Sequence, residues 1–227
     1  MIRIGIAHKA RQGKNLVAEY LKDLARDSDA VARIYGFADE LKLYCRDHHD
    51  ELLPQWQLAH QTKQIPACKD DPIYGYTRIL QWYGTEVARK RNPEIWVTTL
   101  AERIKKENPD VAIVADVRYP NEAEYIKQNG GHLIKVIRRM KDGSLYQDPT
   151  RDPNHLSEIA LDNYEGWDFE IDVKDGDLRD LKRKATGVWN IITGDFNDLE
   201  EDHSLVLPSL NSDATGFNDD EGPYAWG

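Results

Sequence analysis

Cysteine is scarce in this sequence, and Cys45 and Cys68 are the only two among 227 residues. So few cysteines exclude a disulfide framework and are typical of a reducing cytosol, in which both thiols stay free. The cysteines and histidines include no compact Cys-x-x-Cys pair, and their spacings match no standard zinc site. No apolar run approaches the roughly 18 residues of a membrane span, and no apolar leader follows Met1. We therefore expect a cytoplasmic protein that is neither secreted nor membrane-bound.

Lysine and arginine are absent from residues 195–227, which hold nine acidic residues. Much of the formal net charge of -10 therefore lies in this segment, and residues 1–194 carry 30 basic against 31 acidic residues. A body so close to neutral argues against broad attachment to a polyanion such as DNA or RNA. We interpret residues 195–227 as an acidic C-terminal tail that either stays flexible or docks through its few apolar side chains.

Apolar periodicity predicts alternating strands and helices throughout residues 1–194. Strands are predicted at 2–7, 31–37, 111–115, 132–138 and about 168–173. Helices are predicted at 15–26, 38–48, 74–90, 93–106 and 120–128, from Ser157, and at 177–191. This order predicts one α/β domain with a three-layer fold, in which a parallel sheet carries helices on both faces. The run 111–115 is continuously apolar, which is typical of a strand buried on both faces.

Two polar segments interrupt this alternation. Residues 49–73 contain several prolines, so we predict an irregular insertion on the substrate side. Residues 138–154 carry cations among glycine, aspartate and proline, namely Arg138, Arg139, Lys141 and Arg151. We predict that this second segment is a lid whose cations close over phosphate groups, with ordinary solvated surface charge as the alternative.

The turn after the first predicted strand reads HKARQGKN over residues 8–15. A Walker A phosphate loop needs glycine at special backbone positions, amides that point at phosphate oxygens, a lysine for the outer phosphates and a hydroxyl for Mg²⁺. Gly13 and Lys14 fit this pattern, whereas His8 and Asn15 depart from it, and an ordinary strand-to-helix turn is the alternative. We predict an ATP-binding loop in which Lys14 is catalytic and Asn15 faces Mg²⁺ through water. Its members are Ala10, Arg11, Gln12, Gly13, Lys14, Asn15 and Leu16.

Four further blocks of sequence stand out besides this loop. They are FADELK at 37–42, QWYGTE at 81–86 followed by Arg89 and Trp96, DVRYPNEA at 116–123 and HLSE at 155–158. Together they resemble the deoxynucleoside monophosphate kinases of large DNA bacteriophages, which are relatives of adenylate kinase, from Ile2 to about Lys182. The loop of that family reads GKARSGKDT, so its Gly, Ser, Asp and Thr are replaced here by His8, Gln12, Asn15 and Leu16.

The resemblance implies a P-loop kinase that transfers phosphate from ATP to a deoxynucleoside monophosphate with Mg²⁺. It also implies a phage-encoded enzyme in a bacterial host, with small-molecule nucleotides as partners. The family's substrate-binding or catalytic positions match Arg78, Gln81, Gly84, Thr85, Trp96, Asp116, Arg118, Glu122 and Glu158. We add Asp39 and Arg89 to the substrate-binding set, and we predict that Arg78, Asp116 and Arg118 act in catalysis beside Lys14.

Elementary chemistry supports part of this set. Asp116 follows a buried strand at the sheet edge where ligands bind, so its carboxylate could hold Mg²⁺ through water or orient a sugar hydroxyl. Arg118 can pair bidentately with phosphate, and Glu122 could bind a base edge or anchor Arg118. A structural salt bridge is the alternative for Asp116 and Arg118. Trp96 is more typical of a core than of a base platform, and Glu158 could instead cap a helix.

The helical members of the set also have structural alternatives. Gln81, Gly84 and Thr85 lie on one helical side at spacings of three and four, so they could approach one ligand together. Arg78 and Arg89 are candidate phosphate clamps, and a solvated helix face is the competing interpretation. Whether the chain forms a homodimer is left open.

Two other functions remain open from the sequence. One is a kinase that acts on a hydroxymethylated base in DNA, for which Asp39 or Asp116 would activate the hydroxyl. The other is a catalytically weakened nucleotide-binding protein, because the departures at His8, Asn15 and Leu16 could preserve the fold without turnover.

Overall fold

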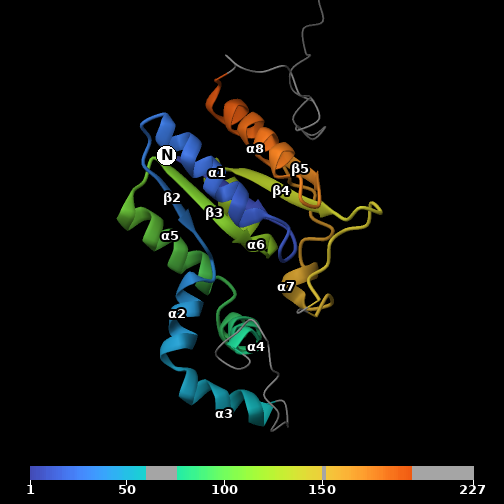
Figure 1. The fold of residues 1–227 in the computed structure, drawn as a ribbon. Helices are drawn as coiled ribbons and strands as arrows, with labels where there is room; N and C mark the ends of the chain where they lie inside the picture. The colour runs from blue at the N-terminus through green and yellow to red at the C-terminus, as the bar shows by residue number, and fades with distance from the viewer. Residues whose placement is uncertain (60–75, 150–151, 196–227) are drawn as a thin grey trace, which may run out of the picture.

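The structure is a computed structural model that describes residues 1–59, 76–149 and 152–195. Within these residues the centre is a five-stranded parallel sheet in the order β2-β3-β1-β4-β5 (Figure 1). The strands are β1 (Ile2–Ala7), β2 (Ala32–Tyr35), β3 (Val111–Val117), β4 (His132–Arg139) and β5 (Phe169–Lys174). All five lie where the sequence predicts strands, so the predicted parallel α/β sheet is confirmed.

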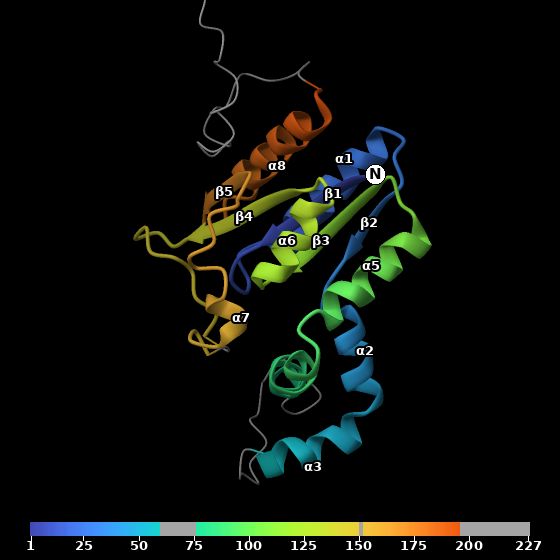
Figure 2. The same ribbon diagram turned by 180° about the vertical axis from the view of Figure 1, so that it is seen from behind.

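Helices cover both faces of the sheet (Figures 1 and 2). On one face, α1 (Lys14–Asp27) packs beside α8 (Leu178–Thr193). On the other face lie α5 (Ile95–Glu107) and α6 (Pro120–Gln128). This arrangement confirms the predicted three-layer fold. Within the part of the chain that the structure describes, no helix is both long and apolar enough to cross a membrane.

The two faces of the central strands feed two hydrophobic cores. Val111 and Ile113 of β3 join the core under α1 and α8, while Ala112 and Val114 join the core under α5 and α6. Successive side chains of a strand point to opposite faces, so burial on both faces explains the continuous apolar run. The strand extends to Val117, so Asp116 lies within β3 and not beyond it.

A helical lobe, residues 39–59 and 76–89, extends beyond the carboxyl ends of the strands (Figures 1 and 2). It comprises α2 (Asp39–Asp47), α3 (His49–Ala59), α4 (Tyr76–Gln81) and the π-helix η1 (Trp82–Arg89). The prediction that residues 49–73 are irregular is wrong for 49–59. Burial of Leu52 and Trp56 in the α5–α6 core stabilises α3 despite the proline within it. Residues 60–73 of the predicted insertion lie outside the described residues.

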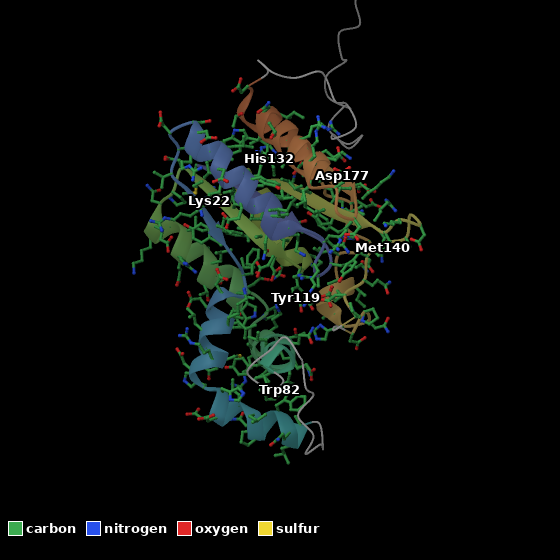
Figure 3. All side chains as sticks on the ribbon, viewed as in Figure 1. Lys22, Trp82, Tyr119, His132, Met140 and Asp177 are labelled. Atoms are coloured by element: carbon green, nitrogen blue, oxygen red, sulfur yellow. The ribbon has the colours of Figure 1, made fainter. Side chains whose placement is uncertain are left out.

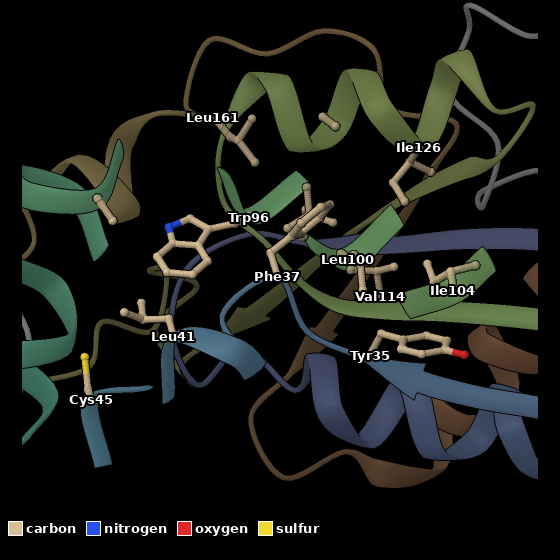
Figure 4. Close-up of a cluster of buried hydrophobic side chains, with 14 of the residues drawn as sticks. Tyr35, Phe37, Leu41, Cys45, Trp96, Leu100, Ile104, Val114, Ile126 and Leu161 are labelled. Atoms are coloured by element: carbon tan, nitrogen blue, oxygen red, sulfur yellow. The ribbon is translucent and has the colours of Figure 1, made fainter. Parts of the chain in front are cut away.

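The π-helix changes which residues of the 81–86 block share a face. A π-helix bonds residue i to i+5, so spacings of three and four no longer align as they do in an α-helix. Gly84 packs against Leu41 of α2, and a Cβ added to Gly84 would lie 2.5 Å from Leu41 Cδ2. The indole of Trp96 donates a hydrogen bond to Gly84 O at 3.3 Å (Figure 4 labels Trp96 and Leu41). Gly84 and Trp96 are therefore packing residues, and their contact joins the lobe to α5.

We predict that Gly84→Ala lowers the free energy of unfolding by about 1–3 kcal/mol, because the added methyl overpacks the contact with Leu41. Urea unfolding of both proteins measures this difference. The loss should shrink in a Leu41→Ala background, where the obstructing methyl groups are gone. Stabilisation by about 1 kcal/mol, as glycine-to-alanine changes bring in open helices, would contradict the packing role.

Candidate active site

The turn between β1 and α1 combines a glycine N-cap with two further residues of positive φ. Gly13 has φ 101° and precedes α1 as its N-cap, without a side-chain cap hydrogen bond. His8 and Arg11 also have positive φ, at 103° and 54°. An uncapped helix N-terminus carries partial positive charge and backbone N–H donors, which together favour a phosphate group. His8 stands at the first glycine position of the motif and adopts a backbone conformation that glycine tolerates better.

Lys14 lies over this loop at the start of α1. Its side chain is buried, and Nζ donates hydrogen bonds to the carbonyl oxygens of His8 at 2.9 Å and Lys9 at 2.5 Å. The ammonium group therefore sits at the mouth of the loop rather than in bulk solvent. Asn15, the predicted magnesium-facing residue, is exposed, and Leu16 packs partly into the α1–α8 core.

The imidazole of His8 is neutral at physiological pH. Burial, together with the nearby charges of Lys135, Lys14 and Lys9, lowers its pKa to about 4. Its Nδ1 lies 3.1 Å from Val136 O, a partner that can only accept. The proton of the neutral ring is therefore on Nδ1, and His8 adds no positive charge to the loop.

Gln12 ties the loop to β4 and the segment that follows it. The side chain is 1% exposed, its Nε2 donates to Tyr146 O at 2.6 Å and its Oε1 accepts from Arg138 N at 2.6 Å. Arg11 adds an ion pair to Asp148 at 3.2 Å. Both polar atoms of the Gln12 side chain are therefore engaged in holding the loop to β4 and the hairpin.

The predicted lid, 138–154, begins with a compact hairpin. Met140 N donates to Ser144 O, and Tyr146 N donates to Arg138 O. Arg138 pairs with Asp175 at 2.6 Å and Arg139 pairs with Asp172 at 2.6 Å, so both guanidinium groups are directed to carboxylates of β5 and the turn after it. These two arginines belong to β4, and the proposed lid begins only after them. Lys141 is exposed, and Arg151 lies outside the described residues.

Asp116 organises the turn between β2 and α2. Its Oδ1 accepts from Phe37 N at 2.7 Å, and its Oδ2 accepts from Ala38 N at 3.2 Å. Asp39 accepts from Gly36 N at 2.8 Å in the same turn. It also pairs with Lys42 at 3.2 Å and with Arg103 at 3.5 Å. Both predicted carboxylates are thus bound to backbone amides of residues 36–38.

Arg118 and Glu158 meet beside the phosphate loop. Arg118 Nη1 lies 3.2 Å from Glu158 Oε1, so the partner of Arg118 among the described contacts is Glu158 and not Asp116. The second oxygen of Glu158 accepts from Ala10 N at 2.9 Å. A small open depression adjoins this group, with about 10 Å³ of space for the centre of a water molecule, and its lining includes His8, Lys9, Arg118, Ser157, Glu158 and Asp162. It lies where β1 and β3 end, the edge at which parallel sheets bind ligands.

Glu122 anchors the segment that carries Arg118. Its carboxylate is 1% exposed and accepts from Arg118 N at 2.7 Å and from Tyr119 N at 3.1 Å. It also pairs with Arg89, whose guanidinium lies 3.8 Å from the ring centroid of Tyr119. Burial, with a smaller contribution from Asp116, raises the pKa of Glu122 to about 7, and Arg89 opposes this shift. Of the two predicted roles, the contacts favour anchoring of Arg118, through its backbone.

Tyr119 extends this cluster toward the helical lobe. Figure 3 labels it between the sheet and the part of the lobe that holds Trp82. Its hydroxyl lies 3.0 Å from Thr85 Oγ1, so Thr85 joins the group while Gly84 does not. Gln81 Nε2 is buried and has no hydrogen-bond partner among the described residues. Arg78 lies in α4, but its side chain is outside the described part of the structure.

Sequence reasoning missed the carboxylates and tyrosines that support the loop. Asp148 and Tyr146 follow the hairpin, and Asp175 follows β5. Each lies far along the chain from the residue it holds, so no local motif identifies the pairs. Tyr119, which contacts Thr85 and Arg89 and not the loop, was also missed, although it stands within the DVRYPNEA block.

Comparison with known proteins shows which family this chain belongs to. A model of the family described as deoxynucleotide monophosphate kinase matches residues 28–185. The chain belongs to this family. As a deoxynucleotide monophosphate kinase family member it is a nucleotide kinase, which confirms the resemblance drawn from its sequence blocks. The match begins at residue 28 and so does not include the loop at 8–15.

Two relatives share the family name. A protein of Acanthamoeba polyphaga mimivirus, provisionally named a deoxynucleotide monophosphate kinase, is 28% identical over 189 residues, which cover 75% of this chain and 88% of the relative. The deoxynucleoside-5'-monophosphate kinase of Escherichia phage T5 is 40% identical over 74 residues, 30% of this chain and 29% of the relative. A solved shikimate kinase from Acinetobacter baumannii in complex with shikimate covers 87% of this chain and 96% of its own at 12% identity, with a TM-score of 0.44, which is too low to bear on function.

We predict that His8→Gly removes a pH-dependent part of the stability. The folded state keeps His8 neutral down to about pH 4, whereas its unfolded value is 6.5, so the unfolded chain binds more protons between these values. Stability contributed by neutral His8 is therefore complete above pH 6.5 and falls by about 3 kcal/mol as the pH drops toward 4. The difference in unfolding free energy between the two proteins, measured from pH 7 to 4, should change by this amount. Parallel profiles would contradict it.

A second prediction concerns Gln12→Ala, which leaves the partly buried Tyr146 O and Arg138 N without their side-chain partner. We expect a loss of about 1–3 kcal/mol in the free energy of unfolding. Gln128→Ala, at an exposed position near the end of α6, is the matched control and should change stability by less than about 0.5 kcal/mol. Equal effects of the two variants in chemical denaturation would argue against the link between loop and hairpin.

Proposed function

We propose that this nucleotide kinase transfers the γ-phosphoryl group of ATP to a deoxynucleoside monophosphate in the presence of Mg²⁺. The observation that carries the proposal is one juxtaposition at the carboxyl edge of the sheet. The loop that leads to Gly13 and Lys14 is joined through Glu158 to Arg118, which follows β3. His8 and Lys9 of this loop line a small open depression together with Arg118. A loop for the donor phosphates thus lies beside a cation suited to an acceptor phosphate.

The donor end fits the phosphates of ATP. The N-terminus of α1 lacks a side-chain cap, which leaves its first-turn amides suited to phosphate oxygens. Lys14 already lies at the loop mouth, and its hydrogen bonds to two loop carbonyls can be exchanged for contacts with the outer phosphates. The side chains of Arg11 and Gln12 brace the loop from the hairpin side, so the amides are held in place before ATP binds.

The residues also fit Mg²⁺, although with few protein ligands. Mg²⁺ usually keeps several waters and binds one or two protein oxygens besides the phosphates of its nucleotide. The exposed amide of Asn15 is available next to Lys14. Each carboxylate oxygen of Asp116 accepts one backbone hydrogen bond and has lone-pair capacity for a metal-bound water. When bound, Mg²⁺ would neutralise charge on the transferring phosphoryl group.

The acceptor end is built around Arg118 and the cluster of Arg89, Tyr119 and Glu122. Arg118 would hold the acceptor phosphate, and Thr85 with Gln81 would line the approach from the helical lobe. Gln81 has a buried amide nitrogen without a described partner, which a substrate acceptor atom could satisfy. An oxygen of the acceptor phosphate attacks the γ-phosphorus in line, and because that oxygen is already ionised no general base is required.

The same geometry favours a free nucleotide over a hydroxyl group of DNA as the acceptor. A hydroxyl acceptor would need a carboxylate to take its proton. The two candidates, Asp39 and Asp116, both accept backbone hydrogen bonds in the turn at 36–38, and Asp39 is further paired with Lys42 and Arg103. Both carboxylates are therefore already engaged in holding this turn, which disfavours a proton-accepting role toward a hydroxyl group.

We predict that Lys14→Met lowers turnover by about two orders of magnitude or more, because one preorganised charge contact with the transferring group is lost. The measurement is ADP release from ATP and Mg²⁺ with each of the four common deoxynucleoside monophosphates. Lys22→Met, at a half-exposed position on the same helix, is the matched control and should keep wild-type turnover. Near-normal turnover of Lys14→Met would contradict the loop assignment. Wild-type protein that releases no ADP with any of the four would overturn the proposed reaction.

A further inference from the structure

We propose that Glu158 is a positioning residue that holds Arg118 against the phosphate loop, so that donor and acceptor sites keep a fixed separation. This inference rests on the proposed phosphoryl transfer. Family resemblance had placed Glu158 in substrate binding, but a carboxylate repels a phosphate group. Its contacts indicate that it acts through its two neighbours and not on the substrate.

The two carboxylate oxygens of Glu158 contact different residues, which follow two different strands. Oε1 pairs with Arg118 Nη1 at 3.2 Å, and Oε2 accepts from Ala10 N at 2.9 Å. Arg118 follows β3, while Ala10 lies in the loop that follows β1. One side chain therefore bridges the predicted acceptor clamp and the predicted donor loop, which are more than a hundred positions apart in the chain.

Burial strengthens the link that Glu158 makes between Arg118 and Ala10. The side chain of Glu158 is 6% exposed and that of Arg118 is 18% exposed, so water competes weakly for either group. A buried charge needs a partner, since removing that partner leaves an unpaired buried ion and lowers the stability of the fold. The guanidinium is held by this pairing, yet a guanidinium has five N–H donors, so contact with one carboxylate leaves others for a phosphate group.

The segment that carries Glu158 is itself fastened to the loop. Glu158 is in α7 (Leu156–Ile159), which His155 caps by accepting a hydrogen bond from Ser157 N at 3.2 Å. Asp162, which follows α7, pairs with Lys9 at 2.9 Å. The segment 155–162 thus contacts the phosphate loop at two consecutive residues, Lys9 and Ala10, and presents Glu158 between them and Arg118.

The chemical consequence is preorganisation of the acceptor clamp. In-line transfer needs the acceptor oxygen, the γ-phosphorus and the leaving oxygen in near alignment, and small displacements of the positioning groups reduce the rate strongly. A long arginine side chain loses considerable rotamer freedom when it binds. Glu158 removes much of that freedom before the substrate arrives, so its contribution should appear in kcat more than in the KM for ATP.

The test is Glu158→Gln, alone and combined with Arg118→Met. The glutamine Oε1 can still accept from Ala10 N, but its amide N–H₂ faces the guanidinium and the pairing is lost. We expect kcat to fall by about 10–100-fold, as for displaced positioning groups, with a change in the KM for ATP of less than about threefold. In the Arg118→Met background the same change should have almost no further effect, because its target is absent.

Glu124→Gln, on an exposed face of α6, is the matched control and should keep wild-type kcat. If Glu158→Gln does not fold, as judged by its thermal unfolding, Glu158→Asp takes its place in the cycle with the same expectations. Wild-type kcat for the Glu158 variant, or losses that multiply with Arg118→Met, would overturn the positioning role alone. Absence of ADP release by the wild-type protein would instead overturn the proposed reaction and this inference with it.

Discussion

Parallel pairing of β1 with β3 and β4 is the constraint on which the rest of the structure depends. Because the strands run in the same direction, their carboxyl ends meet at one edge of the sheet. The phosphate loop after β1, Asp116 and Arg118 at the end of β3, and the hairpin after β4 are all brought to this edge. Two hydrophobic cores hold the helices on either face, so the edge is a rigid base for groups far apart in sequence.

Buried and half-buried carboxylates arrange this edge. Asp116, Glu122 and Glu158 each accept hydrogen bonds from backbone amides, and the last two also hold an arginine. A carboxylate with such partners stays where the fold puts it, because withdrawing it would strand its donors. The acids therefore set the positions of loops and cations, and the cations Lys14 and Arg118 are the groups suited to phosphate. This division of roles agrees with a reaction in which positioning and charge matter more than proton transfer.

The departures of the phosphate loop from its motif have structural counterparts. His8 takes a glycine-like backbone conformation, and its neutral ring is held by Val136 O. Gln12 replaces a small residue of the family pattern, and its side chain spans to β4 and the hairpin. These replacements retain the loop shape while moving part of its support from local backbone freedom to tertiary contacts.

Local pattern was sufficient for the sheet, its flanking helices and the strand-to-helix turn before Lys14, since alternation, apolar runs and a glycine turn depend on neighbouring residues alone. It failed at α3, where burial of Leu52 and Trp56 outweighs the proline signal, and at η1, where packing of Gly84 on Leu41 accompanies a π-helical turn. The sequence by itself also identified the family, through short blocks of which some follow strands and others lie in helices. Only the tertiary structure decided that Glu158 joins Arg118 to Ala10 and that Gln12 joins the loop to Tyr146, because such pairs are chosen by strand order and burial and leave no trace in spacing along the chain.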